Sequence, residues 1–270
     1  MIEQRLLLAA LERLRIAPEA LGRCSGPTLP AGETHFRLQT SLAIALGQSQ
    51  GAQYATMLGA VEPKIRAVVP TGSGGFWALL FSALVNAGYP DLQQVSDLLT
   101  RVLKKSEPLD HLYPALRLLQ SSWEAVEPMV YMPRMAKRPL PNHPVRSVYQ
   151  PVGQGDTAFP EEIFDAMALA TGVQEAGPVI WPEMQSSLAL EGLDGIAPYP
   201  VVDNLKSEDG TPYTGVVVQY EGDGLADPHT IFSQLDDVKY QYGCFIDSIQ
   251  KAEQTTVFEP RSLFLPCSSP

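Results

Sequence analysis

The chain has 270 residues, of which 45% are hydrophobic, and it carries a formal net charge of −11 at pH 7. This length and hydrophobic content are sufficient for one sizeable α/β domain, with or without a cap. The acidic balance and the lack of a long Lys/Arg cluster argue against a nucleic-acid partner, because an acidic surface repels phosphate.

The cysteines and histidines do not form a metal-binding pattern. Cys24, Cys244 and Cys267 are odd in number and lie far apart, so their spacing predicts neither a disulfide framework nor a metal knuckle. The four histidines show no paired Cys or His spacing of the kind that a structural zinc site needs. We therefore expect no metal and no cofactor.

The first 15 residues predict an amphipathic helix, because apolar residues recur at positions 7, 11 and 14. Glu3 precedes this apolar run, Glu12 and Arg13 follow it, and no small-residue cleavage site is clear. The segment therefore does not have the pattern of a signal peptide. No run approaches the ~20 apolar residues of a membrane span. The sequence assigns no compartment.

The next region predicts the beginning of a parallel sheet. After a proline-containing loop at 17–40, the apolar run 42–46 predicts a strand and residues 52–61 predict a helix. A short buried strand follows at 65–70. Strand, helix and strand with tight connections are typical of parallel pairing. The loop Thr71-Gly72-Ser73-Gly74-Gly75 then suggests a turn over the floor of a site, or alternatively a second nucleophile loop, although no Gly-x-Ser-x-Gly frame fits Ser73.

A mostly helical region follows at 76–142. It is apolar nearly all round at 76–87 and amphipathic at 92–104 and 112–126. The region is too long for one crossover helix, so we interpret it as a lid or cap, with an ordinary helical layer as the alternative. Its methionines and aromatic residues, up to Met135, are compatible with a hydrophobic acyl pocket or with a packed helical core.

The sheet is predicted to resume at 145–152, with a helix at 160–170. Residues 172–214 show little periodicity and are interpreted as an irregular insertion. A strongly apolar strand at 214–220 leads to a last helix at 234–252, and the tail from 255 is expected to lie on the surface. The predicted division of the chain is 1–75 for the first part of the core, 76–142 for the cap, 143–252 for the rest of the core and 253–270 for the tail.

The most informative motif is Gly47-Gln48-Ser49-Gln50-Gly51. A strand, a sharp turn with serine at its tip and a helix form the context of a nucleophile elbow, which lifts the hydroxyl above the sheet. Small residues are expected at Gly47 and Gly51, because side chains there would clash across the turn. A glycine-rich loop without catalytic role is the alternative.

In this context the motif resembles the α/β-hydrolase superfamily, in particular its esterase and lipase branch. That superfamily orders its catalytic residues as serine, acid and histidine, and Ser49, Asp156 and His229 occur in that order, each after a predicted strand. The resemblance implies ester hydrolysis through an acyl-enzyme, with His229 as base and the backbone N–H of Gln50 as one oxyanion donor. A serine peptidase is a variant within the same class.

Other residues fit these roles less well. His35 precedes the serine, His111 lies in the predicted cap, and His143 opens a strand at the opposite end from the site. More residues separate Asp156 from His229 along the sequence than one connecting helix and one strand require. The insertion at 172–214 accounts for the additional length. The alternatives for the acid are Asp203, Asp223 and Asp227.

The predicted fold class is α/β, with a mostly parallel sheet of the α/β-hydrolase type and a helical cap. The sheet is expected to be partial, with about four strands, because the 48 residues before Ser49 hold no convincing strand and no His-Gly-Gly-type loop. In the family that loop supplies the second oxyanion donor, so the chain resembles the C-terminal half of the domain. The elbow strand would then be an exposed apolar edge.

We expect self-association at this edge, or a missing N-terminal segment that covers it, together with weak or no activity. The expected ligand is a small-molecule or lipid ester, of a kind that the sequence does not specify. The alternative function is a binding or interaction module with a truncated hydrolase fold, acting through the edge or the cap.

Overall fold

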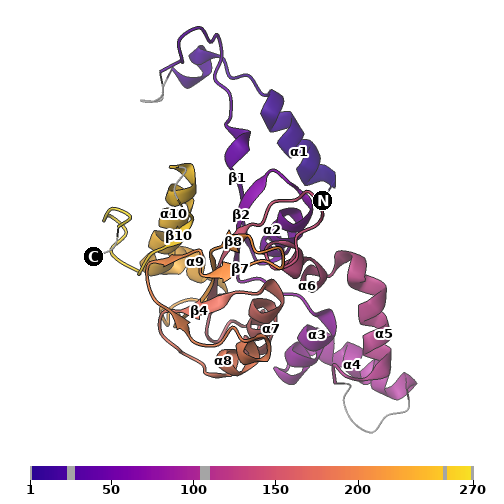
Figure 1. Cartoon of the computed structure of the whole chain (residues 1–270). Helices are drawn as coiled ribbons and strands as arrows, with labels where there is room; N and C mark the ends of the chain where they lie inside the picture. The colour runs from indigo at the N-terminus through magenta and orange to yellow at the C-terminus, as the bar shows by residue number, and fades with distance from the viewer. Residues whose placement is uncertain (1, 23–27, 104–109, 252–253, 269–270) are drawn as a thin grey trace.

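The computed structural model describes residues 2–22, 28–103, 110–251 and 254–268, so Cys24 and the predicted helix ends at 1, 104 and 252 lie outside the described residues. Its centre is a six-stranded sheet with all pairs parallel and the order β1-β2-β3-β9-β4-β5 (Figure 1). The strands are β1 (Ala43–Gln48), β2 (Ile65–Thr71), β3 (Ser147–Gly153), β9 (Gly215–Tyr220), β4 (Gln174–Ala176) and β5 (Ile196–Ala197). The predicted α/β class and parallel sheet are confirmed.

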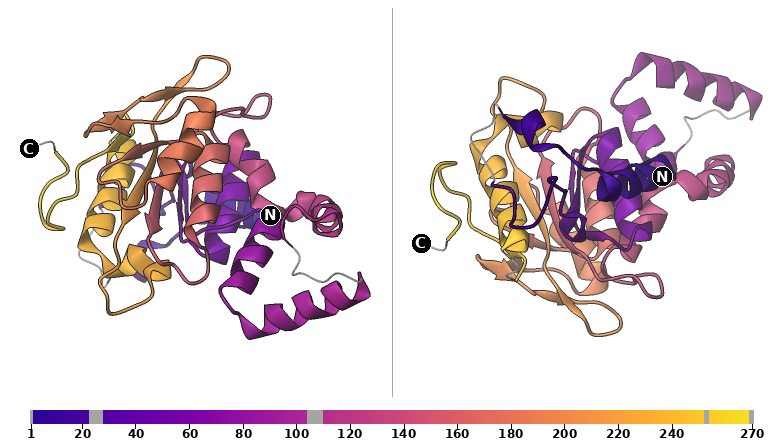
Figure 2. Two further views of the ribbon diagram at one scale, coloured as in Figure 1. Left: turned by 90° about the horizontal axis from the view of Figure 1, so that it is seen from below. Right: turned by 90° about the horizontal axis from the view of Figure 1, so that it is seen from above.

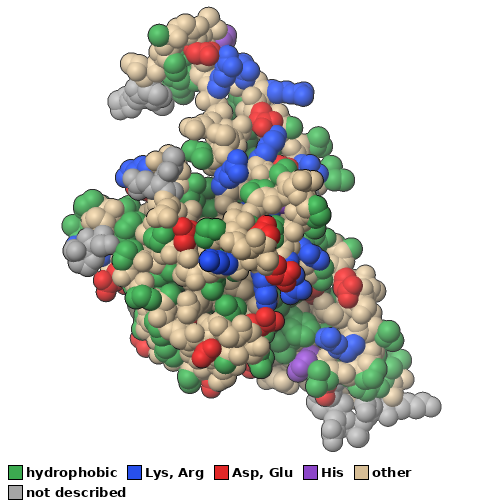
Figure 3. Space-filling model, viewed as in Figure 1, with side chains coloured by type: hydrophobic (Ala, Val, Ile, Leu, Met, Phe, Trp, Pro, Cys, Tyr) green, Lys and Arg blue, Asp and Glu red, His purple; other side chains and the backbone are tan. Residues whose placement is uncertain are grey.

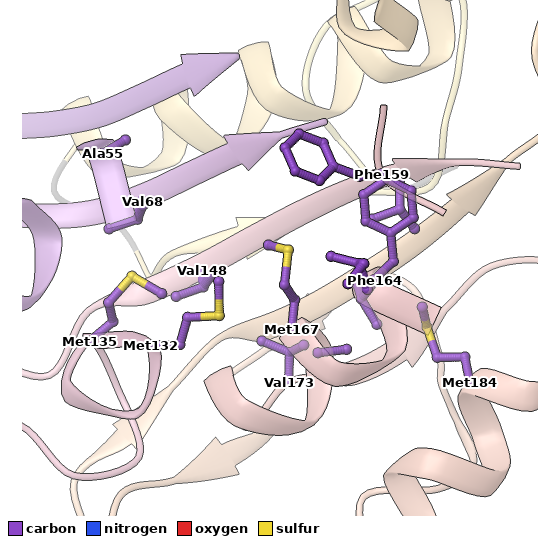
Figure 4. Close-up of a cluster of buried hydrophobic side chains, with 14 of the residues drawn as sticks. Ala55, Val68, Met132, Met135, Val148, Phe159, Phe164, Met167, Val173 and Met184 are labelled. Atoms are coloured by element: carbon purple, nitrogen blue, oxygen red, sulfur yellow. The ribbon is translucent and has the colours of Figure 1, made fainter. Parts of the chain in front are cut away.

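Helices cover both faces of the sheet, and the alternation of side chains along the strands supplies both cores. In β9, Val217 belongs to one hydrophobic core, whereas Val216 and Val218 belong to the other. The first core packs against α2 (Gln50–Val61), α7 (Glu161–Thr171) and α8 (Glu183–Leu188), and Figure 4 shows part of it. The second packs against α9 (Ile231–Gln234) and α10 (Asp236–Gln250).

The four longest strands are those predicted, but the prediction of an irregular segment at 172–214 is wrong in part. This segment contributes β4 and β5 to the far edge of the sheet, beyond β9. Strands of two or three residues are too short to show a period-two pattern, so only their pairing partners define them. The segment also contains α8, η5 (Ala189–Glu191), β6 (Val201–Val202), β7 (Leu205–Lys206) and β8 (Pro212–Tyr213).

The predicted cap region begins with three helices that protrude from the sheet as an arm (Figure 2). They are α3 (Trp77–Asn86), α4 (Pro90–Val102) and α5 (Pro114–Trp123). The region ends in short turns, η3 (Glu124–Val126), α6 (Pro128–Tyr131) and η4 (Met132–Arg134). Met132 and Met135 are fully buried in the first core, against the sheet, as Figure 4 shows. Of the two readings for these methionines, a packed core is the one that the structure supports.

The elbow strand β1 lies at the edge of the sheet and pairs only with β2. Leu46, near its end, is 45% exposed. The preceding segment, with α1 (Ile2–Arg13), η1 (Pro18–Leu21) and η2 (Thr40–Leu42), extends away from the sheet in Figure 1. No residue of α1 is buried, and the helix is tied to the core through the ion pair of Arg5 with Glu62 at 2.9 Å.

The C-terminal segment differs from its prediction. Cys244, on α10, forms a disulfide with Cys267 in the tail, and their Cα atoms are 5.3 Å apart. The chain turns back after α10, and β10 (Thr256–Val257) pairs with β6, so that Val257 is fully buried. The tail is therefore anchored at two points, which the linear spacing of the cysteines could not indicate. None of the described helices is long and apolar enough to span a membrane.

Candidate active site

Ser49 occupies the turn between β1 and α2 in a strained backbone conformation, with φ 57° and ψ −125°. Such a conformation is rare for a residue other than glycine, and it persists only where the surroundings enforce it. The backbone N–H of Ser49 donates to the carbonyl of Thr71 at 3.0 Å, and its own carbonyl accepts from Ala52 at 2.9 Å. Both bonds use the backbone, so the half-buried side chain is held at the carboxyl end of the sheet.

The two glycines of the motif have different roles. A Cβ atom on Gly47 would lie 2.2 Å from the carbonyl oxygen of Gly51, which is a severe clash with backbone. A Cβ on Gly51 would meet no atom within 4 Å. The predicted steric requirement is therefore confirmed at Gly47 and wrong at Gly51. Gly51 contributes the backbone that Gly47 approaches, whereas its own Cα faces open space.

This difference predicts opposite effects of alanine at the two positions. Gly47→Ala should destabilise the protein by roughly 1–3 kcal/mol or more, as overpacking of a tight site does. Gly51→Ala should be neutral or stabilising by up to about 1 kcal/mol, because glycine is unfavourable within a helix. Urea unfolding of both variants beside the parent measures this. Equal destabilisation by the two substitutions would contradict the described turn.

Asp156 and His229 form a hydrogen-bonded pair at the same end of the sheet. His229 Nδ1 lies 2.9 Å from Oδ2 and 3.1 Å from Oδ1 of Asp156, whose side chain is completely buried. Oδ1 also accepts the backbone N–H groups of Ala158 at 2.8 Å and Phe159 at 2.9 Å, which fixes the carboxylate. The hydrogen bond that the His229 ring donates to Asp156 raises the pKa of His229; burial of the ring opposes this, and the charges of Asp156 and Asp227 add to the rise.

The histidine loop is tied directly to the serine turn. Gln48, the residue before Ser49, accepts from the hydroxyl of Thr71 and donates through Nε2 to the carbonyl of His229. Gly72 follows Thr71, and a Cβ there would lie 2.6 Å from that carbonyl oxygen and 3.2 Å from Nδ1. Ser49 and His229 are thus held through shared neighbours. No hydrogen bond joins the Ser49 hydroxyl to the His229 ring, and such contacts are often loose before substrate binds.

Two residues of this site, Gln48 and Phe159, were given no role from the sequence, and a third, Asp227, was considered only as an alternative acid. The Phe159 ring lies 5.7 Å from the His229 ring, centroid to centroid. Asp227 accepts the backbone N–H of His229 at 2.8 Å and also binds Thr157 on the acid loop. Only Gln48 carries a sequence signal, its position inside the motif. The other two act through contacts between distant segments.

The alternative histidines lie elsewhere. The His35 ring contacts Thr34, the His111 ring packs against Phe76, and the His143 ring reaches the carbonyls of Pro141 and Val61. None of these contacts involves Ser49.

The alternative acids do not contact the ring of His229. Asp203 accepts from Gln254, and Asp223 accepts backbone N–H groups of its own loop. Asp227 accepts from Thr157 and from the backbone N–H of His229, not from its ring. Ser73 is 1% exposed, so the second candidate serine is not accessible to a substrate.

Gln50 is the first residue of α2. Its backbone N–H has no partner within the helix and lies at the positive end of the helix dipole, where an oxyanion is stabilised. The segment at 28–42 enters β1 from the end opposite to Ser49, as Figure 1 shows. Among all the residues that the structure describes, no group of three or more His, Cys, Asp or Glu side chains is placed to hold a metal ion.

The solved structures that are similar to this chain in part include two enzymes. Acetyl xylan esterase 1 from Thermoanaerobacterium sp. aligns over 52% of this chain and 38% of its own length, with 16% identity and a TM-score of 0.36. A 2,6-dihydroxy-pseudo-oxynicotine hydrolase aligns over 95% of this chain and 53% of its own length, with 18% identity and a TM-score of 0.38. This chain thus spans about half of the second structure and less of the first.

No protein-family model and no curated protein matches the chain. The structure is an α/β fold with a parallel sheet, in which the serine turn follows β1, Asp156 follows β3 and His229 follows β9.

Proposed function

We propose that this chain is a serine hydrolase that cleaves carboxylic esters through an acyl-enzyme, with Ser49 as nucleophile, His229 as base and Asp156 as the orienting acid. The observation that carries the proposal is the hydrogen bond from His229 Nδ1 to the buried Asp156. It lies at the carboxyl end of the sheet, where the strained turn holds Ser49. The partial likeness to two hydrolases is compatible with it.

The proposed reaction has two steps. With Nδ1 protonated and bound to Asp156, Nε2 of His229 is free to take the hydroxyl proton of Ser49, whose oxygen attacks the ester carbonyl. The resulting imidazolium, stabilised by Asp156, gives its proton to the departing alkoxide. A water molecule then loses a proton to the same nitrogen and hydrolyses the acyl-Ser49 bond, which regenerates the serine.

The developing negative charge on the carbonyl oxygen has one assigned donor, the N–H of Gln50. Loss of one oxyanion donor typically costs about 10²–10³ in rate. We therefore expect turnover by this chain to fall below the ~10 s⁻¹ that is the usual median for enzymes.

Labelling with a fluorophosphonate tests the proposal without depending on rapid turnover. We expect a single adduct, on the peptide that contains Ser49, and no labelling after heat denaturation. Ser73→Ala should be labelled as the parent protein is. An adduct mapped to another residue would refute the assignment of the nucleophile.

Absence of any adduct on the folded protein would favour the non-catalytic alternative. The observation behind that alternative is the open edge of β1 with the exposed Leu46. Such an edge presents unpaired backbone groups to another chain. In that case Leu46→Lys should change the state of association of the protein in analytical ultracentrifugation.

A further inference from the structure

Two hollows meet at Trp77 and Trp123 on the helical arm. The outer hollow, of about 480 Å³, is lined by α2 from Gln50 to Met57 and, on the side of the arm, by the two tryptophans with Ala125 and Val126. The inner hollow, of about 230 Å³, lies between α3, α4 and α5, and the same two tryptophans form part of its wall. The two rings therefore form a wall that both hollows share.

The inner hollow is apolar. Among the described residues, leucine, valine, phenylalanine, alanine and tryptophan side chains line it, and Gln120 is the polar exception. The amide of Gln120 is already engaged, since its oxygen accepts from Ala78 N–H at 2.9 Å and its nitrogen donates to Glu127 at 2.7 Å. The cavity therefore offers contacts to hydrocarbon and no free polar group from Gln120. Figure 3 shows hydrophobic side chains on the surface of the arm as well.

A buried carboxylate fixes the wall between the hollows. Glu127, 1% exposed, accepts the backbone N–H groups of Phe76 at 2.7 Å and Trp77 at 2.9 Å, at the start of α3. Through Gln120 it also binds α5, the helix that ends at Trp123. Trp77 and Trp123 thus lie on two helices, α3 and α5, that Glu127 and Gln120 join through several hydrogen bonds, so the wall that the two rings form is fixed within the arm.

The position of the two hollows relative to the proposed catalytic residues indicates whether they bind the acyl or the alcohol part of an ester. The outer hollow begins at Gln50, the proposed oxyanion donor and the residue that follows Ser49. Neither hollow is lined by Ser49 itself, by His229 or by the His229 neighbours Gly72 and Phe159. The leaving alcohol must lie near His229 to receive its proton. The acyl group therefore extends along α2. Resting on the proposed function, we propose that the substrates are esters of medium- to long-chain aliphatic acids, whose distal carbons lie in the inner hollow.

A chain-length series with one filled cavity tests this proposal. With p-nitrophenyl esters, kcat/KM should rise at least tenfold from butyrate to octanoate, because each buried CH₂ contributes about threefold to fourfold. Val95 lines the inner hollow, so Val95→Trp should remove this preference. Leu98→Trp is the matched control, since Leu98 lies on the same helix, is 58% exposed and does not line the hollow.

Binding without catalysis separates this proposal from the proposed function. In Ser49→Ala, decanoate should change tryptophan fluorescence and acetate should not, because two of the three tryptophans line the hollows and Trp181 is buried elsewhere. Adding Trp123→Phe should reduce the change, and adding Val95→Trp should abolish it.

Each outcome bears on one of the two proposals. If Ser49 is not labelled but decanoate binds as described, the acyl site stands and the hydrolase proposal fails. If Ser49 is labelled but Val95→Trp and Leu98→Trp have the same chain-length profile and the same decanoate binding, the acyl site is refuted.

Discussion

Replacing Ser49 with alanine is expected to reduce ester hydrolysis to the uncatalysed background and to leave thermal unfolding nearly unchanged. Removal of the nucleophile in a well-studied triad costs on the order of 10⁶-fold in kcat, because the base and the acid have no function without it. The fold should tolerate the change, since the hydrogen bonds that hold the turn use the backbone of Ser49 and the rare φ of 57° is equally strained for alanine.

The measurement is hydrolysis of short p-nitrophenyl esters beside circular-dichroism melting curves. Ser73→Ala is the matched control, because Ser73 lies in the other glycine-rich loop and its side chain is buried. That variant should keep parent activity if it folds. Hydrolysis retained by Ser49→Ala and lost in a folded Ser73→Ala would move the nucleophile to the second loop.

Asp156→Asn should lower kcat by about 10⁴-fold, the loss seen when an amide replaces the acid of such a triad. Asparagine retains an oxygen for the N–H groups of Ala158 and Phe159, so the loop should keep its shape. Its amide nitrogen, however, cannot accept from Nδ1 of His229. The ring then takes the wrong tautomer, with its remaining lone pair directed away from the serine.

The same substitution should change the pH dependence. The hydrogen bond to Asp156 raises the pKa of His229, and only the neutral ring acts as base. Activity of the parent is therefore lost as pH falls through this raised pKa, and the acid limb of Asp156→Asn should move to lower pH. For stability, the protonated pair contributes below the unfolded pKa of about 6.5 and this contribution is lost as pH rises through the folded value.

Asp223→Asn is the control for the acid, because Asp223 lies on the histidine loop but binds only nearby backbone. It should keep the parent rate and pH profile. A variant of Asp223 or Asp203 that abolishes activity, beside an Asp156→Asn protein that keeps it, would assign the acid to another loop.

Much of the candidate site could be predicted from contiguous residues. The apolar run before Gly47, the small residues around Ser49 and the helix that follows specify a strand, a sharp turn and a helix through local preferences alone. Ser49, Asp156 and His229 each follow a parallel strand, and the carboxyl ends of parallel strands all lie at the same end of a sheet. The placement of the three residues at one end of the sheet therefore follows from the topology.

The tertiary structure decided what depends on contacts between distant segments. It showed that the chain after α10 returns to pair Cys244 with Cys267, and that β4 and β5 extend the sheet through pairing alone. It also placed the Gln48 side chain on the carbonyl of His229.

The walls of the hollows, Trp77 and Trp123, come from different helices and meet only because α3 and α5 pack together. Periodicity and turn chemistry are properties of neighbouring residues and can be read along the chain. Which side chains face each other across a cavity depends on how whole elements pack, and the linear sequence does not express that.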